Sequence, residues 1–354
     1  MAEKPQGEHW RWQHSRAEAG PAQFEPVQFE AIDGWSADDH CAALACYLQL
    51  AGQMQQPLPD PAEVSSLLVD RKKARFFFEK NFAAFRVSAA PGLLTAYFEP
   101  VLKGSRRPSP AFNVPVYRRP DDLAPLPQGH PLAQLCLTAG RKTASGFEPY
   151  STRAEIEAGI LAGLGLEILY LADPVQVFIM HVQGSGLVQL DDGGAVRLTF
   201  DGKNGHAYTS IAKVLVERGE LSREGAHLEG MVAWLMARPE RLALLNENKS
   251  YIFFKELEYS APTPMGSSGA HLQPGRSLAA DPLYHAAGTP IWVAAPELTF
   301  ESAPFHRLLI AQDTGSAITG PQRGDVFAGT GADAGRVAGH IRHPCAFITL
   351  RPKR

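Results

Sequence analysis

The stretch LLIAQDTGSAITGPQRGDVFAGTGADAGRVAGHIRHPCAF, residues 308–347, sets the architecture that we predict for this chain. It contains Asp313, Asp325 and Asp333 among seven glycines, with the apolar run LLIA shortly before Asp313 and the pair VF directly after Asp325. Strands that end in acids and are joined by glycine-rich turns can aim carboxylates into a cleft. Acids at strand ends also merely solvate turns, so this pattern alone leaves the role of each aspartate open.

Two short motifs inside this stretch resemble signatures of other enzyme classes. DTGS at 313–316 resembles the active-site signature of aspartic proteases, which need two carboxylates that share a proton, and the sequence has one such motif. GTGADAG at 329–335 resembles a dinucleotide-binding glycine motif, which must open a βαβ unit and precede an acid by about 20 residues. Too few residues follow Gly335 for that unit. We therefore reject the dinucleotide interpretation and keep a protease as a remote alternative.

The bulk composition is that of a globular protein. The chain has 354 residues, of which 45% are hydrophobic and 20% charged, and it is long enough for two domains. Its net charge of -3 gives no sign of nucleic-acid binding, and no apolar run approaches the roughly 20 residues that span a bilayer. The sequence has no HExxH motif and no cysteines at ligand spacing, so we expect no metal and no organic cofactor.

The predicted elements run in the order helices, then strands mixed with helices, then strands. Residues 1–34 are expected to be loosely structured. Ser36 is predicted to open a helix with Asp39 three residues later, as in a capping box, and a second helical region covers 61–84. Residues 175–190, VQVFIMHVQGSGLVQL, are predicted to form two strands joined by a tight Gly-Ser-Gly turn. This order favours an α+β fold, mainly β, over a doubly wound sheet.

The middle of the chain has strands and helices of its own, which suggests an insertion. We expect residues 103–254 to form one lobe. Residues 1–102 and 255–354 are then expected to close on each other and form the second lobe.

Several stretches, in the same order along residues 85–351, resemble the membrane-bound lytic murein transglycosylase A (MltA) family. They are TAYFEPVLKGS, VPVYRRP, YSTRAEIEAG, FIMHVQGSGLVQL, DGKNGHAYTSIAKVLVERGE, SYIFFKE, GRSLAAD, GTPIWV and IAQDTGSAITGPQRGDVFAGTGADAGRVAG. Each piece alone is weakly specific, whereas all of them in one order are strongly specific. The resemblance says little about residues 1–84.

The resemblance implies both an activity and a fold. The implied activity is cleavage of the β-1,4 bond between N-acetylmuramic acid and N-acetylglucosamine in the glycan strands of peptidoglycan. No water is added, because the muramic C6 hydroxyl attacks C1 and leaves a 1,6-anhydro ring. The implied fold is a double-psi β-barrel lobe, built from both chain ends and containing a C-terminal 3D-type segment. A smaller β-rich inserted domain specific to the family completes it, with the glycan groove between the two lobes.

The resemblance also implies a place in the cell. We expect a periplasmic protein that acts as a monomer on peptidoglycan, with outer-membrane association or membership of cell-wall enzyme complexes. The first 20 residues lack the apolar core of a signal peptide. No cysteine precedes Cys41, so a signal peptide or lipid-anchor cysteine would have to lie outside this sequence.

The family match assigns roles to individual residues. Asp325 in RGDVF falls on the single catalytic acid/base, and Asp313 in QDTG falls on a supporting position near it. The matched substrate-binding positions are Tyr97, Glu99, Gln183, Gly184 and Ser185. A family member carries Thr at the position of Glu99, which leaves open whether this glutamate shapes a sugar subsite or adds a second acid.

Physical chemistry explains how one acid can be enough. Ordinary glycosidases use two carboxylates, but a transglycosylase finds its nucleophile in the substrate. One residue can protonate the leaving glycosidic oxygen and then take the proton of the C6 hydroxyl, provided that a raised pKa keeps it protonated near neutral pH. Two alternatives remain. One is a muramidase that uses Asp313 or Glu99 as its second carboxylate, and the other is a non-catalytic peptidoglycan-binding protein.

Overall fold

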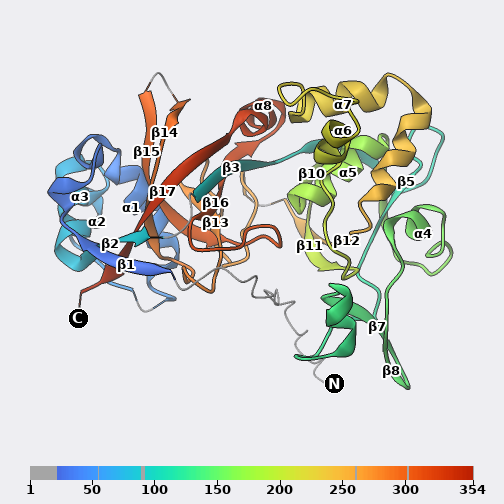
Figure 1. The fold of residues 1–354 in the computed structure, drawn as a ribbon, viewed down its shortest axis with the longest axis horizontal. Helices are drawn as coiled ribbons and strands as arrows, with labels where there is room; N and C mark the ends of the chain where they lie inside the picture. Colours follow the sequence, from blue (N-terminus) through green and yellow to red (C-terminus); the bar gives the residue numbers. More distant parts are fainter. Residues whose placement is uncertain (1–21, 55, 89–91, 260, 301–302, 354) are drawn as a thin grey trace. The chain divides into compact units, whose positions relative to one another are not determined.

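The computed structural model describes residues 22–54, 56–88, 92–259, 261–300 and 303–353, and these divide into two compact units. Residues before 100 and after 260 form the first, which we call the barrel unit. Residues from 100 to 259 form the second, the inserted unit (Figure 1).

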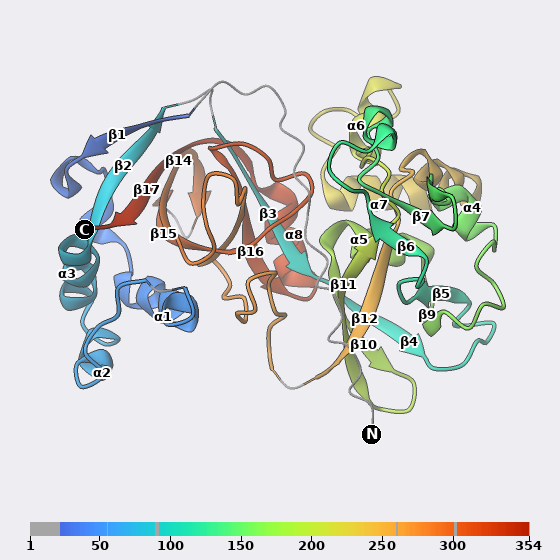
Figure 2. The ribbon, with the colours of Figure 1, turned by 90° about the horizontal axis from the view of Figure 1, so that it is seen from below.

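The barrel unit is built around one closed sheet. Its strands are β1 (Gln23–Val27), β2 (Phe82–Ser88), β3 (Gly92–Glu99), β13 (Ser277–Ala280), β14 (Pro290–Phe300), β15 (Ala303–Asp313), β16 (Arg323–Thr330) and β17 (Arg342–Pro352). The strand order is β1-β2-β17-β14-β15-β13-β16-β3, and β3 also pairs with β17. Six strands, from β17 round to β3, therefore close into a barrel (Figure 2). The prediction of a mainly β fold with a barrel made from both chain ends is confirmed.

The two faces of strand β15 explain why its sequence is a continuous apolar run and does not alternate. Leu308 and Ile310 pack with the N-terminal helices, whereas Leu309 and Ala311 pack inside the barrel. A strand that is covered on both faces reads as a continuous apolar run. The buried Gln312 continues the helix-facing side, because its Nε2 donates to the carbonyl of Cys46. Asp313 therefore belongs to the other side of the strand.

The described residues of the barrel unit form four helices: α1 (His40–Ala51), α2 (Val64–Leu67), α3 (Arg71–Asn81) and α8 (Ala332–His340) (Figure 1). Helix α1 begins one turn later than predicted, because Asp39 caps it by accepting from the backbone N–H groups of Cys41 and Ala42. Residues predicted to be one helical region at 61–84 form α2, α3 and the start of β2. Of the residues expected to be loosely structured, 1–21 lie outside the description and 23–27 form β1.

A buried ion pair ties the segment before α1 to the barrel. The side chains of Asp38 and Arg276 are 4% and 7% exposed, and their closest contact, Nη1 to Oδ2, is 2.8 Å. A second contact, Nη2 to Oδ1, is 2.9 Å, and the backbone N–H of Leu308 also donates to Asp38. Burial alone would raise the pKa of Asp38, but the Arg276 hydrogen bonds and charge together bring it below its ordinary value.

The inserted unit holds two smaller sheets and several helices. Its elements are β4 (Val101–Ser105), β5 (Val114–Tyr117), β6 (Leu123–Pro125), β7 (Ala139–Thr143), β8 (Gly146–Glu148), α4 (Arg153–Glu157), β9 (Glu167–Leu171), α5 (Pro174–Gln183), β10 (Ser185–Leu190), β11 (Ala195–Lys203), α6 (Ile211–Glu217), α7 (Leu228–Met236) and β12 (Ile252–Glu258). The sheets run β12-β11-β10-β4-β9-β5 and β6-β7-β8. Within the described residues of both units, no helix is long and apolar enough to cross a membrane.

One prediction for this unit was wrong. Residues 175–190 are not two strands, since the first half is helix α5 and only the second half is strand β10. Asp173 caps the helix by accepting from Val175 and Gln176 N–H groups. Gly184 ends it with φ 80°, a left-handed conformation that favours glycine after a helix.

Candidate active site

The two aspartates singled out in the sequence lie in one row across the barrel wall. Asp313 on β15 is opposite Ala279 on β13, Ala279 is opposite Asp325 on β16, and Asp325 is opposite Thr95 on β3. Two strand spacings separate the backbones of the aspartates, about 10 Å. The residue between them, Ala279, has a short side chain and is buried. The barrel thus presents both carboxyl groups on the same side of its wall.

Asp325 is held through one of its two carboxyl oxygens. The Thr95 hydroxyl donates to Oδ1 at 2.5 Å, while within the described part of the chain Oδ2 has no hydrogen-bond partner. The side chain is half-buried. Burial raises the pKa of Asp325 above its ordinary value of 3.8, and the charge of Asp313 adds to this, although the Arg323 charge and the Thr95 hydrogen bond oppose it. A carboxyl with a raised pKa keeps its proton to a higher pH than a free aspartic acid does, which is what a general acid requires.

Asp313 is held through both oxygens. Its Oδ1 accepts from the backbone N–H groups of Ser267 and Thr314, each at 2.9 Å, and its Oδ2 accepts from the Tyr97 hydroxyl at 2.8 Å. Burial raises the pKa of Asp313, and these hydrogen bonds counter part of that rise. A carboxylate with this many fixed donors is a poor nucleophile, because its lone pairs are already engaged.

Tyr97 and Glu99 lie two residues apart on β3, but their side chains have different surroundings. The Tyr97 ring lies 5.4 Å from the ring of Phe327, and burial together with Asp313 raises the pKa of its hydroxyl. Tyr97 therefore joins the aspartates. Glu99 is completely buried and accepts from the Thr330 hydroxyl at 2.9 Å. The prediction that Glu99 contacts the substrate disagrees with this burial, because a fully covered side chain cannot touch a glycan.

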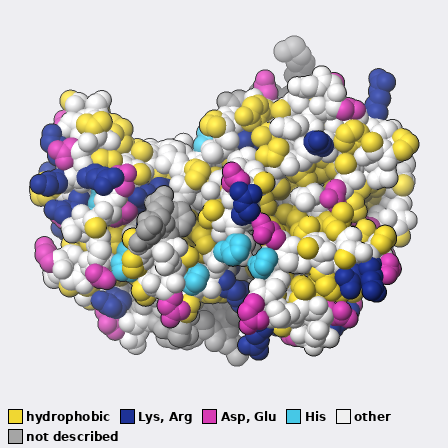
Figure 3. All heavy atoms as spheres, turned by 90° about the horizontal axis from the view of Figure 1, so that it is seen from above, with side chains coloured by type: hydrophobic (Ala, Val, Ile, Leu, Met, Phe, Trp, Pro, Cys, Tyr) yellow, Lys and Arg dark blue, Asp and Glu magenta, His cyan; other side chains and the backbone are white. Residues whose placement is uncertain are grey.

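The remaining matched residues belong to the inserted unit. Gln183 is the last residue of α5, Gly184 follows it, and Ser185 begins β10. Gln183 lines a pocket of about 150 Å³ whose walls come from α5, α6 and α7 and from the segments beside them. Exposed large apolar side chains of this unit include Tyr208, and Figure 3 shows hydrophobic side chains gathered on its surface. Of the three matched residues, Gln183 thus lines a partly apolar pocket, and Gly184 and Ser185 follow it in the chain.

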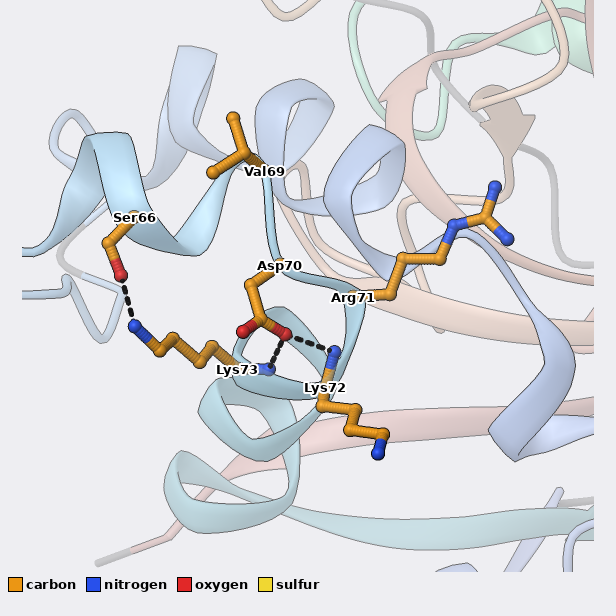
Figure 4. A pocket seen from close by; sticks show the side chains of 6 residues that line it. All are labelled: Ser66, Val69, Asp70, Arg71, Lys72 and Lys73. Atoms are coloured by element: carbon orange, nitrogen blue, oxygen red, sulfur yellow. Dashed lines mark hydrogen bonds between the residues drawn. The ribbon is translucent and has the colours of Figure 1, made fainter.

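A larger hollow, of about 600 Å³, has no evident chemistry. It lies where α3 begins and contains none of the predicted site residues (Figure 4). Asp70 uses its carboxylate to cap α3, and the Lys73 ammonium donates to the Ser66 hydroxyl at 2.8 Å. These contacts stabilise the helix end. Across the residues that the structure describes, no group of three or more His, Cys, Asp or Glu side chains could hold a metal ion.

Sequence reasoning missed two residues of the site, Thr95 and Arg323. The Arg323 guanidinium donates to the Thr95 hydroxyl at 2.8 Å and to the carbonyls of Leu93 and Gly324. A signal was available, since Thr95 precedes Tyr97 by two residues and Arg323 precedes Asp325 by two. Residues two apart in a strand share a face. Their cross-strand pairing could not be read from the sequence.

Comparisons with known proteins agree with this architecture. Residues 93–255 match the family model described as the MltA specific insert domain, and residues 276–351 match the model described as the 3D domain. The chain is 38% identical over 259 residues to the membrane-bound lytic murein transglycosylase A of Vibrio cholerae, a match that covers 71% of this chain and 63% of that protein. This match therefore spans less than two thirds of that relative's length.

Two solved structures extend the comparison to nearly the whole chain. The membrane-bound lytic murein transglycosylase from Agrobacterium tumefaciens is 34% identical, with a TM-score of 0.81 and coverage of 93% of this chain and 97% of that one. Escherichia coli MltA with bound chitohexaose is 26% identical, with a TM-score of 0.68 and coverage of 99% and 98%.

Proposed function

We propose, because this chain belongs to the membrane-bound lytic murein transglycosylase A family, that it is a peptidoglycan lytic transglycosylase. Family membership supports the reaction class. The observation within the chain that carries the proposal is the pair of aspartates. Burial raises the pKa of both. Within the described residues, one carboxyl oxygen of Asp325 has no hydrogen-bond partner, whereas both oxygens of Asp313 accept from fixed donors. Of these two aspartates, Asp325 is therefore the one with a carboxyl oxygen open to exchange a proton with a substrate.

The proposed reaction uses Asp325 twice. In the first half its Oδ2–H bond breaks as the proton passes to the glycosidic oxygen, whose bond to C1 of the muramic residue also breaks. In the second half the C6 oxygen bonds to C1, and the C6 hydroxyl proton returns to Oδ2. Asp313 supports the first half, because its charge raises the pKa of Asp325. No water enters the product, and the acid is regenerated.

A muramidase is the second candidate, and the geometry gives it less support. It needs a base or a nucleophile in addition to the acid. Glu99 is buried, and both oxygens of Asp313 already accept hydrogen bonds. Incubation with purified peptidoglycan sacculi, followed by mass analysis of the released muropeptides, separates the candidates. Anhydro ends support the transglycosylase, reducing ends support the muramidase, and binding without release supports a non-catalytic protein.

The substrate and cellular location follow from the same premise. A relative was solved with chitohexaose, a chain of N-acetylglucosamine units, so we propose that glycan strands of peptidoglycan bind here. The barrel unit would supply the chemistry, and the insertion, residues 103–254, would supply glycan contacts through Gln183, Gly184 and Ser185. Relatives named membrane-bound support an envelope-associated protein. We propose the periplasm, with outer-membrane anchoring or cell-wall complexes as its setting.

Asp313→Asn is expected to reduce activity without abolishing it. The substitution removes a charge that raises the pKa of Asp325, so that pKa falls. Since only the protonated acid works, the pH at which activity is lost moves downward, and a shift of one unit lowers the rate at neutral pH about tenfold. A pH–rate profile of muropeptide release checks this. Loss of activity at a higher pH than in the wild type would contradict the supporting role.

Gln183→Ala is expected to weaken glycan binding while the protein stays folded. Losing one hydrogen-bonding side chain at a binding site typically raises the dissociation constant by about fivefold to tenfold. Calorimetric titration with a chito-oligosaccharide measures it. Gln189→Ala is the matched control, because Gln189 is an exposed glutamine on the adjoining strand β10. Equal affinities for the two variants would remove Gln183 from the site.

A further inference from the structure

The hydrogen bonds around Asp325 form a chain with a fixed direction. The guanidinium of Arg323 donates through Nη2 to the Thr95 hydroxyl oxygen at 2.8 Å, and that hydroxyl lies 2.5 Å from Oδ1 of Asp325. Arginine has donors and no acceptor. The Thr95 oxygen must therefore accept from Arg323. The one hydroxyl proton of Thr95 is then free to point at Asp325.

The backbone keeps these hydrogen-bonding side chains in place. Arg323, Thr95 and Asp325 all lie on the paired strands β16 and β3, where Asp325 is directly opposite Thr95 and Arg323 is opposite Leu93. Arg323 also donates through Nη1 to the carbonyls of Leu93 and Gly324. The guanidinium is thus fixed by main-chain groups, and it does not depend on the acid for its position.

We propose that Thr95 and Arg323 are positioning residues that reserve Oδ1 of Asp325 as an acceptor, so that the proton transferred in the reaction is always on Oδ2. This proposal rests on the proposed function. It also assigns the pair a second task. When Asp325 has given up its proton, the Thr95 hydroxyl and the nearby Arg323 charge stabilise the carboxylate until the C6 hydroxyl returns a proton.

The proposal accounts for two opposing influences at one carboxyl. Burial and the Asp313 charge favour the protonated acid that begins the reaction, whereas Arg323 and Thr95 favour the carboxylate that must exist midway. Other charged or titratable groups nearby are Tyr97, whose hydroxyl is bound to Asp313, and Arg342, which is opposite Thr95 on β17. A general acid that must also act as a base works best when neither form is strongly preferred.

Thr95→Val is expected to raise the pKa of Asp325 by about one unit, because it removes a hydrogen bond to the carboxylate. The alkaline loss of activity then moves to higher pH, opposite to the shift expected for Asp313→Asn. The maximal rate is expected to fall about tenfold or more, since the carboxylate formed midway has lost its donor. Thr95→Ser keeps the hydroxyl and is expected to retain the wild-type profile.

The test is a pair of measurements on the full chain, with and without substrate. Isotope-edited NMR of labelled aspartate carboxyls follows the titration of Asp325, which is assigned by its absence in Asp325→Asn. Muropeptide release gives the pH–rate profile. We expect the Asp325 titration to move upward in Thr95→Val and in Arg323→Gln, and to stay near the wild type in Thr95→Ser. Arg323→Lys keeps the charge and is expected to shift it less than Arg323→Gln.

Each outcome bears on a different claim. An Asp325 titration that is unchanged in Thr95→Val and Arg323→Gln overturns the proposal, whatever the activities are. A protein that releases no anhydro-muropeptides but shows the upward shifts contradicts the proposed function and leaves the positioning roles standing. If Thr95→Val does not fold, the comparison of Arg323→Gln with Arg323→Lys decides the question by the same titration.

Discussion

Asp325→Asn is expected to lower the rate of anhydro-muropeptide release by more than about 10⁴-fold, the upper end of what general acid–base assistance usually contributes. The substitution removes the one proton donor that the described site offers. Asparagine has nearly the same shape, and its amide oxygen can still accept from the Thr95 hydroxyl. The variant should therefore fold and bind glycan as the wild type does. The effect belongs to the chemical step alone.

The matched control for this prediction is Asp333→Asn. Asp333 lies in the same aspartate- and glycine-rich stretch, on helix α8 (Ala332–His340), and its side chain is 89% exposed. We expect wild-type rates for it. Muropeptide release is measured by liquid chromatography with mass detection, alongside binding to sacculi. If Asp313→Asn were inactive while Asp325→Asn kept appreciable activity, the roles of the two aspartates would have to be exchanged.

Asp38→Ala is expected to lower the free energy of unfolding by about 3–5 kcal/mol. Removing one member of a buried ion pair leaves the other charge buried without compensation. In this variant the uncompensated charge is that of Arg276. The same change strips the Leu308 N–H of its acceptor. Urea denaturation measures the effect. Asp333→Ala is the control, because it breaks an exposed ion pair with Arg336, and such pairs contribute less than about 1 kcal/mol.

The stabilisation from Asp38 also has a predictable pH dependence. Its folded-state pKa lies below the ordinary 3.8, so the unfolded chain takes up a proton first as the solution is acidified. The contribution is fully present above that ordinary value and is lost as pH falls below it towards the folded-state pKa. The wild type and Asp38→Ala should therefore converge in stability at acidic pH. A difference in unfolding free energy between the two proteins that stays constant down to pH values well below 3.8 would contradict the ion-pair account.

The fold was predictable where the local sequence pattern and the family resemblance agreed. The helix α5 is the segment where the local pattern was misread. Residues 175–183 are apolar and rich in β-branched side chains, which favours a strand. The structure follows the helix-start signals instead, namely a capping Asp173 and Pro174 in the first turn. Gly184 then ends the helix. Capping chemistry outweighed composition in this segment, and the prediction gave composition the greater weight.

The site was predictable in part. Asp325 and Asp313 could be singled out by family match, and Tyr97 is placed beside them. The spacing of Thr95 from Tyr97 was a signal, but its hydrogen bond to Asp325 could not be foreseen, because that bond depends on the register between β3 and β16, strands more than 200 residues apart in sequence. Burial is equally invisible in a single sequence: the family match assigned Glu99 to the substrate, and the structure buries its side chain. Both the Thr95 hydrogen bond and the burial of Glu99 depend on contacts between segments far apart in the sequence.

We propose that Asp325 acts as the single acid/base of a transglycosylase. This role is tested most directly by digesting sacculi in water enriched in heavy oxygen and measuring the mass of the released muropeptides. We predict products that are lighter than hydrolysed ones by one water molecule, that carry no heavy oxygen at C1, and that are absent with Asp325→Asn. Reducing ends labelled with heavy oxygen, or unlabelled anhydro products formed by Asp325→Asn at the wild-type rate, would contradict the account.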